Sequence, residues 1–333
     1  MATQQADSPL PWGEFELIDS VFAPLARALP GAFALKDDVA TLRPKSGHEL
    51  VLKTDSTIEN VHFLPGDPPG TIGQKALRRA LSDIAAKGAI PAVYLLAMAM
   101  PPTITRNWIE KFAEGLRGDQ ADFCVALTGG ETCRTPGVLT ITVTMIGWVS
   151  EGRLLRRSGA QPGDDVWVTG TIGDAAGGLC LLKQAASLED NAARDYLIGR
   201  FRVPEPRLEF GVALGAIASA AIDVSDGLIA DLGHLSDLSG TRIQIDAERV
   251  PISAQLRALW GSTAALVAIS AGDDYEIAFT APAGSAGEIV AAARRTHTRV
   301  TPIGRVVEGS PGISLLDSAG QDVTLKEKGY RHF

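Results

Sequence analysis

The first half of the chain alternates between helical and extended hydrophobic patterns. Apolar residues recur at three- and four-residue steps in three segments, which predicts amphipathic helices over residues 13–29, 73–87 and 107–116. Short apolar or alternating runs predict strands over residues 50–54, 94–100, 123–127 and 138–149. In the last of these strands Thr alternates with larger apolar residues, as on a strand with one buried face.

A polar stretch beginning near residue 150 marks the expected boundary between two domains. After it, the pattern predicts strands over 166–169, 242–245 and 275–280 and helices over 175–183, 191–198, 207–219 and 287–295. A further apolar segment, 220–222, precedes a helix that begins near Leu228. The halves are of similar size but share no close sequence repeat. The expected fold class is therefore α+β, with domains at 1–150 and 151–333.

Length and composition agree with extensive packed cores. The chain has 333 residues, of which 45% are hydrophobic, which suits two domains or one large α/β domain and excludes global disorder. The net charge of -8 argues against general nucleic-acid binding, which needs a basic face. The 35 glycines indicate many tight turns or anion sites lined by backbone N–H groups.

Neither a membrane span nor an export signal is expected. Residues 1–10 lack the basic and apolar regions of a signal peptide, and the longest uncharged run, 88–105, is broken by three prolines. The cysteines form no CxxC pair, so neither a disulfide framework nor a zinc site is indicated. They are Cys124, Cys133 and Cys180. We therefore expect a reducing, cytoplasmic environment.

Carboxylates next to Gly, Ser or Thr at the ends of apolar segments are the main candidates for chemistry. They are Asp37, Asp38, Asp55, Asp83, Glu131, Asp223, Asp226, Asp273 and Asp274. Hard oxygen ligands grouped in this way suit Mg²⁺, which binds a few carboxylates together with water and substrate phosphates. Such ions would let an acidic protein bind a phosphate substrate.

Several of these acids also have ordinary structural explanations. Asp37 and Asp38 could form an exposed turn, and Asp55 could be a loop aspartate after a strand. Asp83 lies on the small-residue flank of its predicted helix, which predicts a half-buried carboxylate. An i,i+4 pair between Asp83 and Lys87 is the alternative for that position.

Two acids lie three residues apart where an apolar segment meets a helix, in Asp223-Val224-Ser225-Asp226-Gly227. Helix capping would explain Ser225 or Asp226, but it would not also explain Asp223. The start of a helix also attracts phosphate, because its first backbone N–H groups are unpaired. Gly129-Gly130-Glu131-Thr132 has the same layout after its predicted strand, although a Gly-Gly-acid sequence alone is weak evidence.

Two more segments could contact phosphate or could simply be linker and turn. Arg157-Ser158-Gly159-Ala160 offers a guanidinium group, and Gly170-Thr171-Ile172-Gly173 offers backbone amides. The sequence contains neither a Walker A motif nor the H-R-D and D-F-G motifs of protein kinases. The two common phosphotransferase designs are therefore excluded.

In this order, these motifs resemble the thiamine-monophosphate kinase family, which is related to aminoimidazole-ribonucleotide synthetase and selenophosphate synthetase. The most specific motif is Ile222-Asp223-Val224-Ser225-Asp226-Gly227-Leu228. The others are Gly13 to Ile18, Asp37-Asp38, Thr54-Asp55, Val61-His62-Phe63, Lys75-Ala76-Leu77, Leu81 to Ala86, Arg157 to Ala160, Gly272 to Glu276 and Lys328 to Phe333. The resemblance covers nearly the whole chain and implies a two-domain fold like that of aminoimidazole-ribonucleotide synthetase, with mixed sheets and flanking helices.

The resemblance implies ATP-dependent phosphorylation of thiamine monophosphate to thiamine diphosphate by a homodimer, with an active site between the domains. The first domain would carry metal and ATP ligands and the dimer interface, and the second would complete the site. The implied metal ligands are Asp38, Thr54, Asp55, Asp83, Glu131, Asp223 and Asp226. The implied ATP contacts are Gly130, Glu131, Arg157 and Ser225, and the thiamine-phosphate contacts are His62, Asp273 and Tyr330.

The implied reaction uses ATP and several Mg²⁺ ions but needs no general base. The acceptor phosphate is mostly ionised near neutral pH, since the second pKa of a phosphomonoester is about 6. Metal ions would neutralise the two polyanions and align a direct, in-line transfer without a phosphoenzyme.

Five positions beside the implied ligands depart from the family pattern. Glu131 stands where Asp is usual, Ala80 where Asn is usual, and Asn60 where Gly is usual. Lys36 and Lys53 place two additional ammonium groups near the implied ligands, where they could replace or repel a cation. Our favoured interpretation is that both lysines point to solvent.

Three functional hypotheses follow from this pattern. The first is an active thiamine-monophosphate kinase, and the second is a relative that uses ATP on another acceptor. The third is a non-catalytic protein that binds a nucleotide or a thiamine phosphate. Selenophosphate synthetase is disfavoured because its N-terminal reactive Cys or selenocysteine has no counterpart before Cys124.

Overall fold

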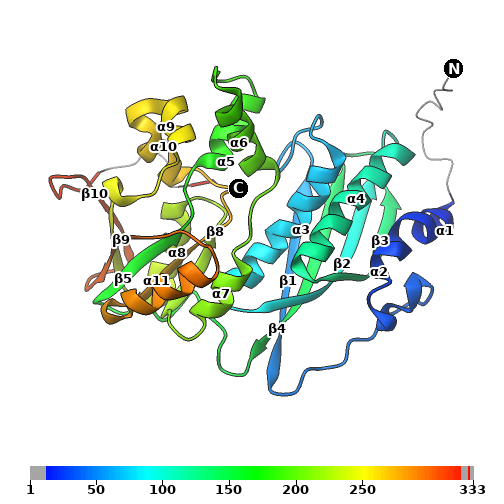
Figure 1. The fold of residues 1–333 in the computed structure, drawn as a ribbon, viewed down its shortest axis with the longest axis horizontal. Helices are drawn as coiled ribbons and strands as arrows, with labels where there is room; N and C mark the ends of the chain where they lie inside the picture. The colour runs from blue at the N-terminus through cyan, green and yellow to red at the C-terminus, as the bar shows by residue number, and fades with distance from the viewer. Residues whose placement is uncertain (1–12, 324–328, 331–333) are drawn as a thin grey trace. The chain divides into compact units, whose positions relative to one another are not determined.

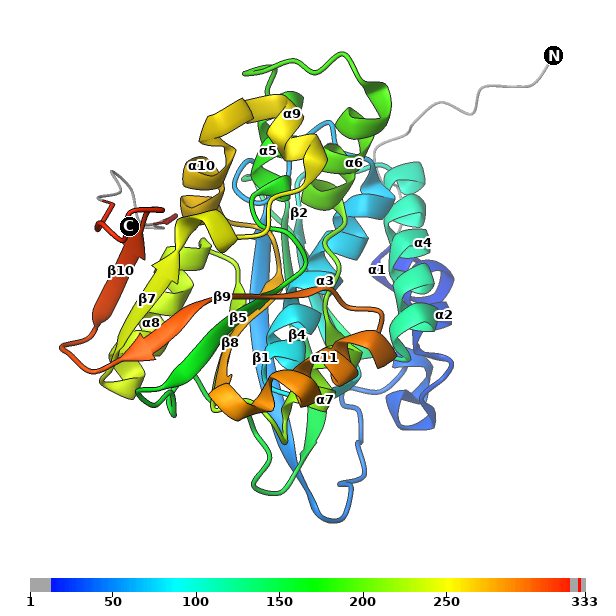
Figure 2. The same cartoon turned by 60° about the vertical axis from the view of Figure 1, so that its left-hand side comes forward.

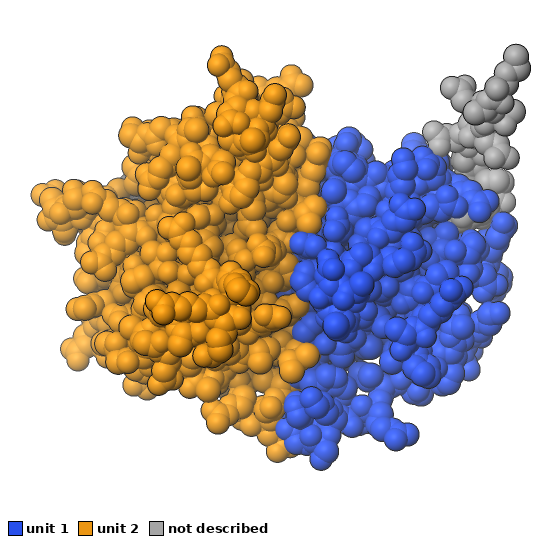
Figure 3. All heavy atoms as spheres, viewed as in Figure 1, with its two compact units in different colours: residues 1–81, 91–148 blue, residues 82–90, 149–333 orange. Residues whose placement is uncertain are grey.

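The structure is a computed structural model that describes residues 13–323 and 329–330 (Figure 1). The chain forms two compact units, shown in different colours in Figure 3. Unit 1 comprises residues 1–81 and 91–148, and unit 2 comprises residues 82–90 and 149–333. The segment 1–10 lies outside the described residues, as do Lys328 and the last three residues of the C-terminal motif.

Unit 1 contains a four-stranded sheet with the strand order β1-β4-β2-β3. Its strands are β1 (His48–Ile58), β2 (Ile90–Met100), β3 (Ala126–Arg134) and β4 (Thr140–Ser150), and β2 runs parallel to β3. Helices α3 (Pro69–Ala86) and α4 (Arg106–Phe123) cover one face (Figure 1). The alternation predicted for β4 is confirmed, because its Ile, Val and Met side chains are buried while the Thr side chains between them are partly exposed.

The N-terminal helical segment of unit 1 contains three short helices in succession. They are α1 (Glu14–Leu17), the π-helix η1 (Ile18–Phe22) and α2 (Ala23–Ala26), and the 3₁₀ segment η2 (Pro30–Leu35) follows. Phe22 and Leu25 are buried, as the predicted amphipathic pattern requires, but Phe15 of the same pattern is 80% exposed and the helix ends at Ala26.

Unit 2 contains a six-stranded sheet with the strand order β10-β7-β9-β5-β8-β6, which is antiparallel except for the β10–β7 pair (Figure 2). The strands are β5 (Asp164–Thr169), β6 (Ala220–Val224), β7 (Arg242–Asp246), β8 (Glu276–Pro282), β9 (Val300–Val307) and β10 (Gly312–Leu316). The α-helices are α5 (Asp174–Leu182), α6 (Asn191–Arg202), α7 (Leu208–Leu214), α8 (Leu228–Ser239), α9 (Ala254–Trp260), α10 (Ala264–Ser270) and α11 (Ala286–Arg295). Short 3₁₀ segments are η3 (Ala247–Arg249), η4 (Gly261–Thr263) and η5 (Ala283–Ser285).

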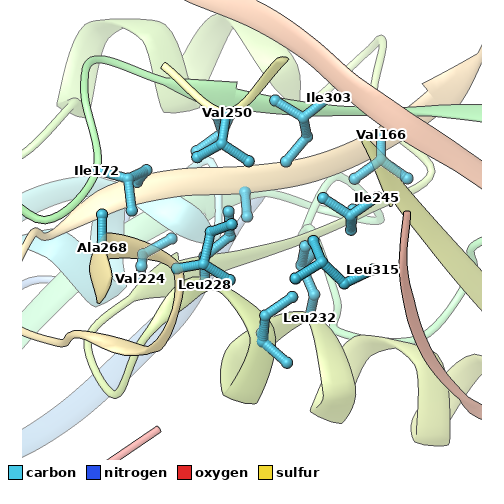
Figure 4. Packing of buried hydrophobic residues seen from close by; sticks show 14 of the residues in the cluster. Val166, Ile172, Val224, Leu228, Leu232, Ile245, Val250, Ala268, Ile303 and Leu315 are labelled. Carbon is cyan, nitrogen blue, oxygen red and sulfur yellow. The ribbon is translucent and has the colours of Figure 1, made fainter. Parts of the chain in front are cut away.

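Both faces of the sheet in unit 2 are packed against apolar residues. Val166 and Val168 of β5 point to the cluster that includes Leu228 and Leu232 of α8 (Figure 4). Trp167, between them in the sequence, belongs to a separate cluster with α7 and α11. This alternation along one strand follows from the two-residue period of a strand.

Most predicted elements are present, and two of them have a wrong end. The strand predicted over 123–127 is present but begins later, at Ala126, because α4 continues to Phe123 and ends at Cys124 in the left-handed conformation. The helix predicted over 207–219 ends at Leu214, and the apolar residues that follow pack as a loop. Helices α9 and α10 and strands β9 and β10 were not predicted. Within residues 13–323 and 329–330, no helix is both long and apolar enough to cross a membrane.

Candidate functional site

A tight turn joins β6 to α8 and contains Ser225, Asp226 and Gly227. The backbone N–H groups of these three residues all donate to Oδ2 of Asp231, at 3.0, 3.1 and 3.1 Å. Gly227 adopts a φ of 123°, which L side chains rarely adopt. The start of α8 was expected to attract phosphate, but the three N–H groups that precede the helix all donate to the carboxylate of Asp231.

The same turn is held on its carbonyl side by two segments distant in sequence. Asp273 donates its N–H to the carbonyl oxygen of Ser225 at 2.8 Å, and Tyr330 donates its N–H to that of Asp226 at 2.9 Å. The hydroxyl of Tyr275 donates to Oδ1 of Asp273 at 2.9 Å. Four residues that the sequence analysis selected, Ser225, Asp226, Asp273 and Tyr330, therefore meet at one place in unit 2.

A cavity of about 570 Å³ opens beside this turn. Its lining includes Asp226, His234, Gly329 and Tyr330, together with apolar side chains of α8 and β10. The ring of Tyr330 is about half exposed, and the carboxylate of Asp226 is partly exposed. An aromatic ring and a carboxylate in one cavity suit a ligand that has both a flat ring and a positive charge or a metal-bound phosphate.

Asp223 lies in β6, three residues before Asp226, and its carboxylate is buried. Its Oδ2 accepts a hydrogen bond from the hydroxyl of Ser82 at 3.0 Å. The neighbouring Asp83 is half-buried, as predicted. The ammonium group of Lys87 donates to a backbone carbonyl of β6 at 2.8 Å. Ser82 and Lys87, which lie on either side of Asp83 in the sequence, are therefore both hydrogen-bonded to β6.

Arg157 lies at the opposite end of α8 from Asp226. The hydroxyl oxygen of Ser239, the last residue of α8, accepts the N–H groups of Gly159 and Ala160 at 3.2 Å each. A helix of this length spans roughly 18 Å. The main chain of Arg157 is thus not brought next to Asp226 within unit 2, although its side chain is exposed.

For the turn Gly170 to Gly173, the sequence left a phosphate contact and an ordinary turn as alternatives, and the hydrogen bonds favour the turn. The N–H of Gly170 donates to a backbone carbonyl at 2.9 Å, as does that of Ile172. Gly173 donates to Oδ2 of Asp274 at 2.7 Å. Burial raises the pKa of Asp274 well above its ordinary value, although the N–H donor of Gly173 acts in the opposite direction. This segment is therefore a structural turn.

In unit 1, Thr54 and Asp55 lie on opposite faces of β1. Thr54 shares a hydrogen bond of 2.9 Å with Thr144 of β4. Asp55 is within the strand, not in a loop after it, and its Oδ1 lies 3.4 Å from Nζ of Lys53. These two side chains are 19% and 32% exposed. Lys53 is thus partly exposed to solvent, and its ammonium group forms an ion pair with an implied metal ligand.

Gly129, Gly130 and Glu131 belong to β3 and do not form a loop after a strand. Gly130 pairs with Leu96 of β2, and a Cβ atom at Gly130 would collide with the Leu96 carbonyl. The glycine is therefore required by the close approach of two strands. Glu131 is exposed on the same edge strand.

A cavity of about 820 Å³ in unit 1 is lined by several of the selected residues. They are Lys36, Asp37, Asp38, Gly130 and Glu131. Apolar residues from α1, η1 and β2 form much of the remaining wall. The cavity is large enough for a nucleoside, since ligand pockets commonly measure 300–1,000 Å³.

His62 is buried in a turn after β1, and Ile58 donates its N–H to Nδ1 of His62 at 3.0 Å. A substrate contact through His62 would therefore use Nε2. Asn60, in the same turn, adopts a φ of 66°. Asn tolerates this left-handed conformation, so the exchange of the usual Gly for Asn60 preserves the turn. Ala80 is fully buried in α3.

The donor atoms at these positions suit a hard cation. Among residues 13–323 and 329–330, no group of three or more His, Cys, Asp or Glu side chains could hold a metal ion by itself. Mg²⁺ usually binds through one or two carboxylates, water and substrate phosphates, so a sparse set of carboxylates fits it better than it fits Zn²⁺.

Asp231 is the residue of this region that the sequence analysis missed. Burial and the nearby Asp226 raise its pKa to about 7, while the three N–H donors act in the opposite direction. An acid in the first turn of a predicted helix was the available signal. It pointed to a generic helix cap, and the sequence did not reveal that the carboxylate reaches back to three successive N–H groups.

Family models match both halves of the chain. The model described as AIR synthase related protein, N-terminal domain, matches residues 36–149. The corresponding C-terminal domain model matches residues 161–315. Hydrogenase maturation protein HypE of Escherichia coli has the same fold, with a TM-score of 0.78 at 21% identity over 96% of this chain and 98% of that one.

Relatives with higher sequence identity are named thiamine-monophosphate kinase. The thiamine-monophosphate kinase of Caulobacter vibrioides is 39% identical over 98% of this chain and 93% of its own length. That of Bacillus subtilis is 34% identical over 96% of this chain and 99% of its own length. The crystal structure of the Stenotrophomonas maltophilia enzyme superposes with a TM-score of 0.80 at 40% identity, covering 87% of this chain and 91% of that one.

A further structure, AaThiL complexed with AMPPCP and TMP, gives a TM-score of 0.76 at 30% identity and covers 96% of this chain and 97% of that one. The resemblance inferred from the motifs and the two-domain α+β fold are both confirmed. With relatives of this identity aligned over nearly its whole length, the chain belongs to the thiamine-monophosphate kinase family.

Proposed function

We propose that this protein transfers the γ-phosphate of ATP to thiamine monophosphate and forms thiamine diphosphate and ADP. The observation that carries the proposal is the 39% identity with the Caulobacter vibrioides kinase over 98% of the chain. The AaThiL complex with AMPPCP and TMP supports the two substrates. The motif that contains Asp223 and Asp226 supports the binding of Mg²⁺ with a nucleotide, because Mg²⁺ binds through a few carboxylates and substrate phosphates.

In this proposal the chain binds and orients two polyanions. Asp38 and Asp55 in unit 1 and Asp83, Asp223 and Asp226 in unit 2 would hold Mg²⁺, with Thr54 and Glu131 as additional oxygen donors. When bound, Mg²⁺ would neutralise phosphate charge along the path of an in-line transfer. Gly130, Arg157 and Ser225 would contact ATP.

The acceptor side would be formed by His62, Asp273 and Tyr330. The half-exposed ring of Tyr330 can stack on a heteroaromatic ring of thiamine, and Asp273 offers a negative charge to its thiazolium. The acceptor phosphate is its own nucleophile at neutral pH, so no side chain needs to accept its proton.

We also propose that the protein is a homodimer and acts in the cytoplasm. Leu50 and Leu52 are 49% and 67% exposed on the face of β1 that carries Thr54, and Leu95 of β2 is also exposed. A second copy of the chain would cover these apolar side chains. The three cysteines are free thiols, which suits a reducing compartment.

The test is to incubate the purified protein with Mg-ATP and thiamine monophosphate and to measure ADP and thiamine diphosphate. Stoichiometric formation of both products is the expected result. ADP formation only with a different acceptor would replace the substrate assignment. Binding of both ligands without turnover would establish a non-catalytic relative.

Lys53→Gln is expected to lower the Mg²⁺ concentration needed for half-maximal activity by about three- to tenfold. In the present chain the Lys53 ammonium lies 3.4 Å from Asp55, so it would repel a divalent cation at that carboxylate. The measurement is an activity titration with Mg²⁺ at saturating ATP. Lys45→Gln, at an exposed lysine outside β1, is the matched control. An unchanged Mg²⁺ dependence in Lys53→Gln would remove Asp55 from the metal ligands.

A further inference from the structure

We propose that Asp231 is a positioning residue that aims the side chains of Ser225 and Asp226 at the metal and the nucleotide. The inference rests on the proposed function. Its structural basis is that one buried carboxylate oxygen accepts the N–H groups of three successive residues, Ser225 to Gly227.

Both the N–H groups and the carbonyl oxygens of Ser225 and Asp226 are hydrogen-bonded within the protein. Their N–H groups donate to Asp231, and their carbonyl oxygens accept the N–H groups of Asp273 and Tyr330. All four of these main-chain polar atoms are therefore bound within the protein. Only the side-chain oxygens of Ser225 and Asp226 remain to contact a ligand, so the turn acts through them and not through its amides.

Asp231 is suited to this role because it belongs to α8 and the turn does not. Its side chain is 3% exposed, and the helix that carries it is packed into the apolar core through Leu228, Leu232 and Leu235. The turn is thus tied to a rigid element. Three successive N–H groups around one oxygen also form a site that would otherwise bind a free anion, and Asp231 occupies it.

Loss of this acceptor would leave three N–H groups without their partner and would let the turn relax. The carboxylate of Asp226 would then sample several directions. Residues that orient a metal ligand typically change metal affinity or activity 10- to 100-fold when they are replaced. The first quantity to change should be the affinity for the divalent cation.

The experiment compares Asp231→Ala, Asp231→Asn and Asp231→Glu with Leu235→Ala. Leu235 is buried in the same helix, so Leu235→Ala weakens the fold without touching the turn. For each variant the Mg²⁺ concentration for half-maximal activity is measured, and Mn²⁺ binding to the protein with AMPPCP is followed by electron paramagnetic resonance.

Asp231→Ala is expected to raise the half-saturating Mg²⁺ concentration at least about tenfold and to weaken Mn²⁺ binding to a similar extent. Asp231→Asn keeps an acceptor oxygen at the same place and should stay within about threefold of the original protein. If Asp231→Ala does not fold, Asp231→Glu serves the same purpose, because its longer side chain displaces the acceptor oxygen.

The inference is overturned if Asp231→Ala and Asp231→Glu bind Mn²⁺ as Leu235→Ala does, since their effect would then be one of stability alone. The Mn²⁺ measurement needs no turnover. A protein that binds Mn²⁺ through Asp226 but has no kinase activity would therefore contradict the proposed function and leave the positioning role intact.

Discussion

Asp226→Asn is expected to reduce the formation of thiamine diphosphate by about a thousandfold while the protein stays folded. The substitution removes one negative charge and keeps the size of the side chain. Because the main chain of Asp226 is bound to Asp231 and Tyr330, the turn should keep its shape. A loss of several kcal/mol of charge stabilisation corresponds to this decrease, at about 1.4 kcal/mol for each factor of ten.

The measurement combines a coupled assay of ADP release with urea unfolding. Asp195→Asn, at an exposed residue of α6, is the matched control and should leave the rate within about twofold. Asp223→Asn should also abolish turnover, but Asp223 is buried and bonded to Ser82, so part of its effect will be lost stability. Rates close to that of the original protein in both variants would defeat the assignment of these acids as metal ligands.

The elements with strong periodicity could be predicted from the sequence. The segments at β4 and α3 have one apolar and one polar face, and the packing of the structure preserves that division. Element ends were harder to predict. Phe123 is apolar and begins a predicted strand, but it is the last residue of α4, which ends where Cys124 adopts a left-handed conformation that no apolar pattern encodes.

The candidate residues could be selected from the sequence, but their surroundings could not. Gly130 was expected in a loop, whereas its glycine is needed because β2 passes too close for a side chain, which is a contact between segments about 35 residues apart. Thr54 and Asp55 are adjacent in sequence, and the pleat of β1 places them on opposite faces. Such relations depend on strand pairing, which a single sequence does not specify.

In the turn after β6, too, the candidate residues could be selected from the sequence but their hydrogen bonds could not. Its acids and its glycine indicated a phosphate site built from backbone amides. In the structure the carboxylate of Asp226 is partly exposed, but the backbone N–H groups of the turn donate to Asp231 of the following helix. The chemistry of the site thus depends on a residue whose own sequence context resembles that of any helix-capping acid.

Glu276→Ala is expected to lower the free energy of unfolding of unit 2 by about 3–5 kcal/mol. Glu276 begins β8 and has no exposed side-chain surface. Its carboxylate accepts two hydrogen bonds from Arg207 at 2.7 Å, one from Arg200 at 2.8 Å and one from the Thr169 hydroxyl at 2.6 Å. Without Glu276, two guanidinium groups that are only 11% and 13% exposed would lack their main counter-charge.

The measurement is urea unfolding at pH 7, and Glu205→Ala is the matched control. Glu205 contacts the same two arginines but is 60% exposed, so its removal should cost less than about 1 kcal/mol. Equal effects of the two substitutions would show that burial does not strengthen the Glu276 network.

The dependence on pH gives an independent check of the same network. Burial alone would raise the pKa of Glu276, but the hydrogen bonds and charges of Arg207 and Arg200 hold it below its ordinary value of 4.5. A lowered pKa in the folded state stabilises the fold above pH 4.5, and this contribution is lost as the pH falls through the folded-state value. Glu276→Gln should therefore be less stable than the original protein at pH 7, and the difference should shrink below pH 4.5. A difference that stays constant with pH would show that the Glu276 charge contributes nothing and that the loss comes from packing.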